Sequence, residues 1–179
     1  MARYYSLILG LLILLFTLPV HAASLEISST THDGHMYSYY PDANNFGEEY
    51  LMRFGGTSAH EYRPVLVFDL SNLPAGASVS SVILYLYEDE IGSARSGLVN
   101  VPALDRYDVI DESEVTWNQA SSGYSWTGGS PLSSPDPIVS CPGTGDVWFS
   151  TDITSIYEYY DDNSLDTSTF SMVITSSIT

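Results

Sequence analysis

Two neighbouring stretches of the chain, residues 65–70 and 82–87, are runs of β-branched, aromatic and other apolar residues with a single charged position, Asp69. Each run predicts a strand, in which successive side chains point to opposite faces of a sheet. Between them lies a joint that contains Pro74 and Gly76, which is typical of a structured turn. In the first strand, one face carries Leu66, Phe68 and Leu70, and the other carries Val65, Val67 and Asp69. In the second strand, we expect Val82, Leu84 and Leu86 to face inward, and Ile83, Tyr85 and Tyr87 share the opposite face.

Short runs of the same kind recur along the rest of the chain. They predict strands at residues 25–29, 50–54, 98–104, 147–153 and 170–175. Residues 155–160 predict a short helix or a turn, since Ile156 and Tyr160 lie at helical spacing. Residues 121–145 are rich in Ser, Gly and Pro, which predicts a long surface excursion. Short strands with Gly- and Pro-containing turns and no long helix favour an all-β fold, a β-sandwich or jelly roll of antiparallel strands.

The beginning of the chain has the pattern of an export signal. Arg3 precedes an almost wholly apolar run over residues 6–18, and Val20-His21-Ala22 predicts cleavage after Ala22. A membrane span takes ~20 residues, so a retained anchor is the less favoured alternative. We therefore expect residues 1–22 to be a signal peptide and residues 23–179 to form a single secreted, extracellular domain.

The charge of the chain excludes several classes of partner. There are 22 acidic residues against five basic ones, all of them Arg, and the net charge is −17. The chain lacks the excess of basic residues that nucleic-acid-binding proteins have. An anionic membrane would repel the protein once the signal peptide is removed. Cys141 is the one cysteine, so no internal disulfide can form. Its thiol could be buried, reactive or joined to a partner.

Several motifs recur in a fixed order along the chain. The longest motif consists of Arg63 and residues 65–77, which are a predicted strand and the turn that follows it. The others are Asn45-Phe46-Gly47, Leu51-Met52-Arg53-Phe54-Gly55, Leu84-Tyr85-Leu86-Tyr87, Glu114-Val115-Thr116-Trp117-Asn118, and Trp148 with Asp152-Ile153-Thr154. In this order they resemble the family-96 carbohydrate-binding modules, also called DNRLRE or disaggregatase-related domains, across about residues 27–174.

The resemblance implies that the chain binds an extracellular polysaccharide without catalysis. Two departures from the family matter. Val67 stands where the family commonly has Lys, which weakens the case for an anionic sugar such as alginate. The family also continues past the strand that residues 170–175 resemble, so we expect the sheet to lack its last strand or to receive it from a neighbour. An open sheet edge invites pairing with another chain. The alternative function is therefore a self-associating structural protein of the cell surface or matrix.

Sugar binding needs flat aromatic faces and fixed polar groups, which Tyr, Trp and Arg supply. The candidate ligand-binding residues are Arg53, Arg63, Tyr85 and Tyr87 as one patch, and Tyr124 with Trp126 as a second platform. The alternative for the patch is that its tyrosines cover a second layer of the fold and its arginines pair with Glu49 or Glu61. We expect Trp117 and Trp148, which lie in strand motifs, to belong to the core.

Metal binding and catalysis have less support in the sequence. Acidic runs at residues 88–90, 111–114 and 161–166 offer oxygen ligands without the spacing of a calcium loop, which leaves structural calcium as an open alternative. His32 and His35 would point to opposite faces of a strand. No motif names a nucleophile or base. A small polysaccharide lyase using Tyr with His60 or an Arg is the least favoured reading, and we expect no enzyme and no cofactor.

Overall fold

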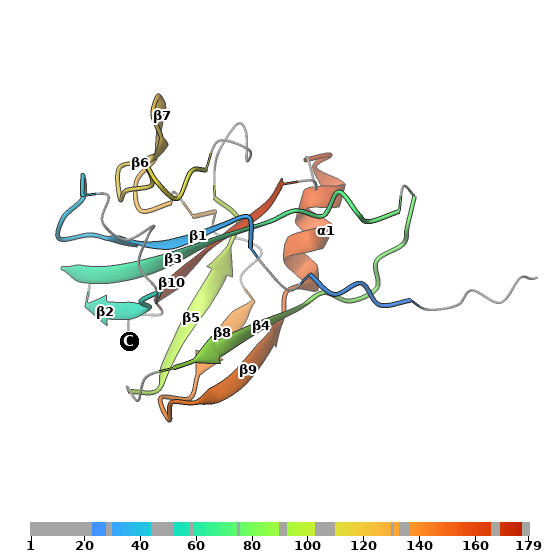
Figure 1. Ribbon diagram of the computed structural model, residues 1–179, viewed down its shortest axis with the longest axis horizontal. Helices are drawn as coiled ribbons and strands as arrows, with labels where there is room; N and C mark the ends of the chain where they lie inside the picture. Colours follow the sequence, from blue (N-terminus) through green and yellow to red (C-terminus); the bar gives the residue numbers. More distant parts are fainter. Residues whose placement is uncertain are drawn as a thin grey trace, which may run out of the picture.

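The structure is a computed structural model that describes residues 23–27, 30–43, 52–57, 59–74, 76–89, 93–102, 110–129, 131–132, 137–165 and 169–176 (Figure 1). Ten strands and one helix occur in this part of the chain. They are β1 (His32–Tyr37), β2 (Gly55–Thr57), β3 (His60–Phe68), β4 (Ile83–Glu88), β5 (Arg95–Asn100), β6 (Gln119–Ser121), β7 (Tyr124–Ser125), β8 (Ile138–Cys141), β9 (Val147–Asp152), α1 (Thr154–Asp162) and β10 (Phe170–Ser176).

All strand pairs are antiparallel, which confirms the predicted all-β fold. The large sheet has the order β1-β3-β10-β5-β8, with β2 also paired to β3. Strands β4 and β9 form a separate pair, and β6 and β7 another. The closure of these sheets into a sandwich or jelly roll stays a prediction.

The large sheet is covered on both faces, and β3 shows why. Leu66 belongs to a first core that also contains Leu84 of β4 and Ile156 of α1. Val65 and Val67 belong to a second core with Trp126. The predicted split of this strand into two faces is confirmed, because both faces are apolar and each meets a different layer. Figure 1 shows β4 and β9 on one side of the large sheet and β6 and β7 on the other.

The pair β4–β9 is covered on one face only. Leu84 is buried, and Leu86 packs against the first core. Ile83, Tyr85 and Tyr87 alternate with them and are exposed. The predicted orientation of this strand is therefore confirmed. A strand with one apolar and one solvated face has this alternation because only one face meets the core.

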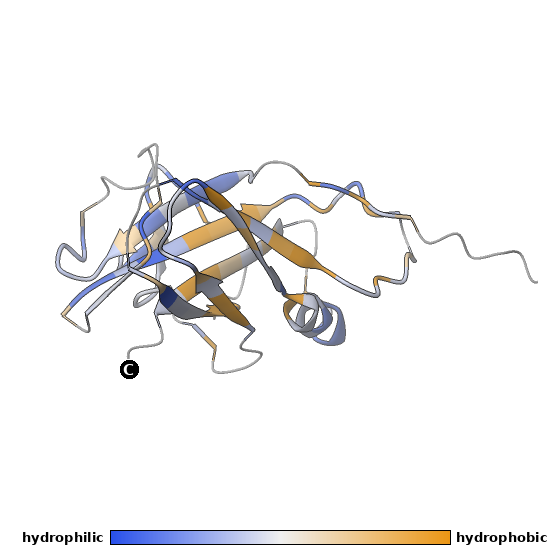
Figure 2. Ribbon diagram, turned by 90° about the horizontal axis from the view of Figure 1, so that it is seen from below, coloured by the Kyte–Doolittle hydropathy of each residue, from blue (hydrophilic) through white to orange (hydrophobic). Residues whose placement is uncertain are grey.

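Of the short helix or turn predicted at residues 155–160, the structure has the helix, α1, with Ile156 and Tyr160 fully buried. The Tyr160 hydroxyl donates to the Ser171 carbonyl at 2.9 Å, which ties the helix to β10. Apolar residues run along the strands, and much of α1 is hydrophilic (Figure 2). The helix thus packs one face on the first core and leaves polar residues outside.

Three strand predictions were wrong in position. Residues 52–54 are not a strand, and the strand begins instead at Gly55, where glycine tolerates the positive φ of 97°. Gly56 has a φ of 122°, and a Cβ there would overlap the His60 carbonyl. Residues 25–27 have no strand, and the predicted strand at 98–104 ends at Asn100. The parts of these predictions at 28–29, 50–51 and 103–104 lie outside the described residues, as do residues 1–22, which were predicted to be a signal peptide, and residues 177–179.

The predicted surface excursion at residues 121–145 was wrong in part, since many of its described residues are exposed but two are anchored in the cores. It contains β8, whose Val139 is buried in the first core, and Trp126, which is buried in the second. The Trp126 indole donates to the Thr116 carbonyl at 2.8 Å, and its backbone N–H donates to Asn118. Ser, Gly and Pro content indicated turns correctly, but the apolar side chains of Trp126 and Val139 anchor the segment to the two cores.

No helix among the described residues is long and apolar enough to cross a membrane.

Candidate functional site

Three aromatic side chains lie on the outer face of the β4–β9 pair. Tyr85 is 64% exposed, Tyr87 47% and Trp148 66%. Tyr87 and Trp148 are opposite each other in the register, with ring centroids 5.2 Å apart and planes at 54°. We call these three residues the aromatic face. Large aromatic side chains held open to solvent beside one another are typical of a binding surface.

The aromatic face is supported by the core beneath it. Its strands carry Leu84, Leu86 and Phe149 on their inner side, where they pack on the first core. The Tyr87 hydroxyl donates to Asp146 Oδ1 at 3.3 Å. Partial burial, together with the negative charges of Asp146 and Asp89, raises the pKa of Tyr87. Tyr87 is therefore a neutral hydrogen-bonding phenol at ordinary pH.

Glu88 fixes the turn that carries Asp146. Its Oε2 accepts hydrogen bonds from the backbone N–H groups of Thr144 and Gly145, at 3.0 and 3.1 Å. Its Oε1 accepts from the Cys141 thiol at 3.0 Å. These hydrogen bonds, the thiol's first, lower the pKa of Glu88. Burial and the Glu88 carboxylate raise the pKa of Cys141, so this thiol is protonated and weakly nucleophilic.

Arg63 does not lie on the aromatic face, so the predicted patch of Arg53, Arg63, Tyr85 and Tyr87 is not formed. Arg63 shares its side of β3 with Val65 and Val67, which face the second core, whereas β4 and β9 cover the first. Its Nη2 bonds Glu61 at 2.8 Å, the pairing weighed as an alternative.

The remaining contacts of Arg63 come from the segment that covers the second core. Its Nη1 donates to the Gly128 carbonyl at 2.8 Å, and its guanidinium lies 4.6 Å from the centroid of the Trp117 ring. Gly128 has no Cβ, which would approach Arg63 Nη1 to 2.6 Å. Arg63 thus joins β3 to residues 117–128 and has a structural role.

Arg53 belongs to a different aromatic group. Its guanidinium lies 5.7 Å from the centroid of the Tyr62 ring, and the Tyr62 ring stacks parallel on Tyr37 at 4.1 Å. This group, the tyrosine cluster, consists of Tyr37, Tyr39, Tyr40, Tyr62 and His60. This cluster was not predicted, since nothing in the spacing of its members along the sequence reveals that β1, its following turn and β3 meet.

The second predicted platform is not formed either. Trp126 is only 5% exposed and is held by Thr116, whereas Tyr124 is 39% exposed on the β6–β7 hairpin. Trp117 packs against the second core, as expected. Trp148 was expected in the core and is exposed instead. Period two along residues 147–152 would have placed it outside with Ser150, because Phe149 between them faces inward.

A calcium site receives no support in the described part of the chain. No group of three or more His, Cys, Asp and Glu residues there could hold a metal ion. Glu88 and Asp111 instead accept hydrogen bonds from neighbouring backbone N–H groups. His32 and His35 lie in β1 at alternate parity, so they point to opposite faces. Glu90 and Asp166 lie outside the described residues.

No protein-family profile matches the chain, and no curated protein matches it significantly. The resemblance to the family-96 modules is therefore carried by the quoted motifs alone.

Proposed function

We propose that this protein is a secreted module that binds an extracellular polysaccharide without catalysis, through the aromatic face. The observation that carries the proposal is the exposure of Tyr85, Tyr87 and Trp148 side by side on a sheet whose other face is anchored in the core. Aromatic rings accept the apolar C–H side of a sugar ring, and the phenol and indole tips bond its hydroxyls.

The geometry suits an extended chain of sugars. Tyr85 and Tyr87 are two residues apart on one strand, about 7 Å, and Trp148 lies across from Tyr87. One polymer can therefore contact several rings at once. Because each ring lies on a paired strand, little conformational entropy is lost on binding.

The charge around the aromatic face favours a neutral polysaccharide. Strands β4 and β9 contain no Arg or Lys, and their neighbours include Asp146 and Asp89. A polyuronate such as alginate would be repelled here. Arg63, which could have attracted it, is engaged by Glu61.

The alternative, self-association through an open sheet edge, has less support. Strand β10 lies between β3 and β5, so the edges of the described large sheet are at β1 and β8, apart from the short β2, which pairs with β3 alone. The Asp33 N–H on β1 donates to Glu112, and the Ile138 carbonyl on β8 accepts from Thr151. Contacts from within the chain already use parts of both edges, which reduces what a second copy could pair with.

The test is a pull-down series with cellulose, chitin, alginate and pectin, each with and without calcium. We expect saturable binding to one neutral polymer that Trp148→Ala and Tyr87→Ala weaken at least tenfold. Tyr124→Ala is the matched control, since it removes a similarly exposed ring elsewhere.

Equal loss in the Tyr124→Ala control, or no binding to any polymer by the folded protein, would contradict the proposal. Concentration-dependent assembly in gel filtration would instead favour the structural protein. Absorbance of unsaturated products during the same incubations would favour a lyase.

A further inference from the structure

The tyrosine cluster brings four phenol rings into contact at the end of β1. Tyr37 of β1 and Tyr62 of β3 are opposite each other in the register, and their rings stack parallel with centroids 4.1 Å apart. The rings of Tyr39 and Tyr40, in the turn after β1, lie 6.0 and 5.7 Å from the ring of Tyr37. Because the four rings touch, an electron removed from one of them can be replaced from a neighbour.

His60 supplies the cluster with a base. The Tyr37 hydroxyl lies 3.2 Å from His60 Nδ1 and donates to it when the imidazole carries its proton on Nε2. Partial burial, and then the contacts with Tyr62, raise the pKa of Tyr37, so this phenol is neutral at ordinary pH. A phenol that loses an electron becomes strongly acidic, and an imidazole accepts a proton near neutral pH. Oxidation of Tyr37 is therefore favoured by an acceptor that is already in place.

The cluster reaches the surface through Tyr39 and Tyr40, which are 54% and 55% exposed. Two tyrosyl radicals join by a bond between the ring carbons next to the hydroxyl-bearing carbons, so two ring edges must meet. Within the cluster, Tyr37 and Tyr62 meet face to face, and Tyr39 and Tyr40 meet edge to face at 75°. The exposed rings are therefore better placed to join a ring of another chain than a ring of their own.

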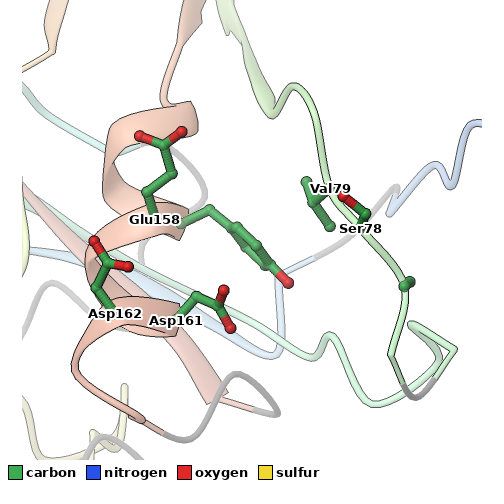
Figure 3. A pocket seen from close by; sticks show the side chains of 7 residues that line it. Ser78, Val79, Glu158, Asp161 and Asp162 are labelled. Carbon is green, nitrogen blue, oxygen red and sulfur yellow. The ribbon is translucent and has the colours of Figure 1, made fainter.

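Other tyrosines of the described chain lack this combination of contact and exposure. Tyr157 lines a hollow of about 290 Å³ between α1 and the segment that precedes β4, where Figure 3 shows Glu158 and Asp161 on the helix. Its side chain is 9% exposed, which keeps it from another chain. Tyr85 is more exposed than Tyr39, but it makes none of the ring contacts found among the described residues.

We propose that the tyrosine cluster is a site of oxidative cross-linking, at which a haem peroxidase and hydrogen peroxide join Tyr39 or Tyr40 to the same residues of a second copy of the chain. Each of the two tyrosines gives up one electron and its phenolic proton, and hydrogen peroxide takes up both electrons and both protons to become two molecules of water. The two radicals form one C–C bond. The hydrogen on each joined carbon then moves to the oxygen, which restores both hydroxyls.

The cluster lies on β1, its following turn and β3, whereas the aromatic face lies on β4 and β9. The proposal therefore does not depend on what the aromatic face binds. A bond at Tyr39 or Tyr40 would join copies of the module covalently and leave the aromatic face open.

The experiment is oxidation of the purified protein with hydrogen peroxide and a catalytic amount of a haem peroxidase at about neutral pH. Denaturing gels measure covalent dimers, and fluorescence measures dityrosine. We expect dimers from the wild type, formed at least tenfold more slowly by the double variant Tyr39→Phe with Tyr40→Phe. Phenylalanine keeps both rings and removes only exposed hydroxyls, so this variant should fold like the wild type, which circular dichroism melting checks.

Tyr124→Phe is the matched control, because it removes an exposed phenol outside the cluster and should leave the rate of dimer formation unchanged. Equal slowing in this control would overturn the proposal. Mass spectrometry of proteolytic fragments identifies the joined residues in the wild type. Cross-links at Tyr85 in place of Tyr39 and Tyr40 would show that exposure alone decides, and dityrosine confined to monomers would overturn coupling between copies.

The variant His60→Phe tests the base. It keeps an aromatic ring beside Tyr39, whose ring lies 4.6 Å from that of His60, and removes the acceptor of the Tyr37 proton. We expect slower dimer formation that free imidazole in the buffer partly restores, since His60 is exposed. A merely structural role would not be restored by imidazole. An unchanged rate in His60→Phe would overturn the role of His60 as the proton acceptor.

Discussion

Two regions of this protein carry large aromatic side chains, and they differ in whether another segment covers them. On the outer side of β4 and β9, Tyr87 and Trp148 are open to solvent. On the opposite side of the molecule, residues 110–129 lie over β3 and bury Trp126. Trp and Tyr therefore occur in both regions, and only one region has the exposure that a ligand needs.

In the covered region, Arg63 is engaged by the segment that lies over β3. Arg63 bonds Glu61 through Nη2 and Gly128 through Nη1 and stacks on Trp117, so both ends of its fork and its planar face are engaged. Glu61 in turn accepts from the N–H and hydroxyl of Ser176 at the end of β10. The residue types that favour sugar recognition thus serve here to join three segments, because the terminal nitrogens of Arg63 and the Glu61 carboxylate bond partners within the chain.

The largest effect is expected from Arg63→Ala. It leaves the nearly buried Glu61 carboxylate without its cation, and we expect a loss of about 3 to 5 kcal/mol in the free energy of unfolding. Urea titration measures this loss. Arg95→Ala on β5 is the control, since Arg95 is exposed, and it should change stability by less than about 0.5 kcal/mol. Equal effects of the two substitutions would show that Arg63 is not the structural arginine.

A smaller effect is expected from pH, through His35. Burial, and then the charge of Arg53, lower the pKa of His35 from 6.5 to about 4. The folded protein therefore prefers the neutral ring, and its stability falls as pH drops below 6.5 and His35 is protonated first in the unfolded chain. The full loss is about 3 kcal/mol, reached below pH 4.

The variant His35→Gln isolates this part of the acid sensitivity. Urea titrations at pH 7, 5 and 4 should show the wild type losing stability relative to the variant over this interval. Parallel curves for the two proteins would mean that His35 has an ordinary pKa. Carboxylates titrate in the same range, and they contribute to both proteins alike.

The smallest effect on stability is expected from Trp148→Ala. Its side chain is 66% exposed, so its removal should cost less than about 0.5 kcal/mol. The matched substitution Trp126→Ala should cost about 3 kcal/mol or more, because it opens a cavity in the second core. Thermal melts of the two variants measure the contrast. Similar melting temperatures would remove the distinction between the open and the covered region.

Much of the local structure could be predicted from the sequence. The two faces of β3 and β4 follow from alternation, as with Leu84 inside and Tyr85 outside. The helix α1 follows from the spacing of Ile156 and Tyr160. The outward direction of Trp148 was available from the same rule. These features depend on residues a few positions apart, where backbone geometry alone decides which side chains share a face.

The candidate sites were decided by tertiary structure. Arg63 meets Gly128 across 65 residues of sequence, and Tyr37 meets Tyr62 through the pairing of β1 with β3. The alternation of side chains along a strand predicts which residues share each of its two faces. Which segment covers each face depends on how distant parts of the chain pack. Burial of Trp126 in the covering segment removed one predicted platform, and the single covered face of β4–β9 left Tyr87 and Trp148 open.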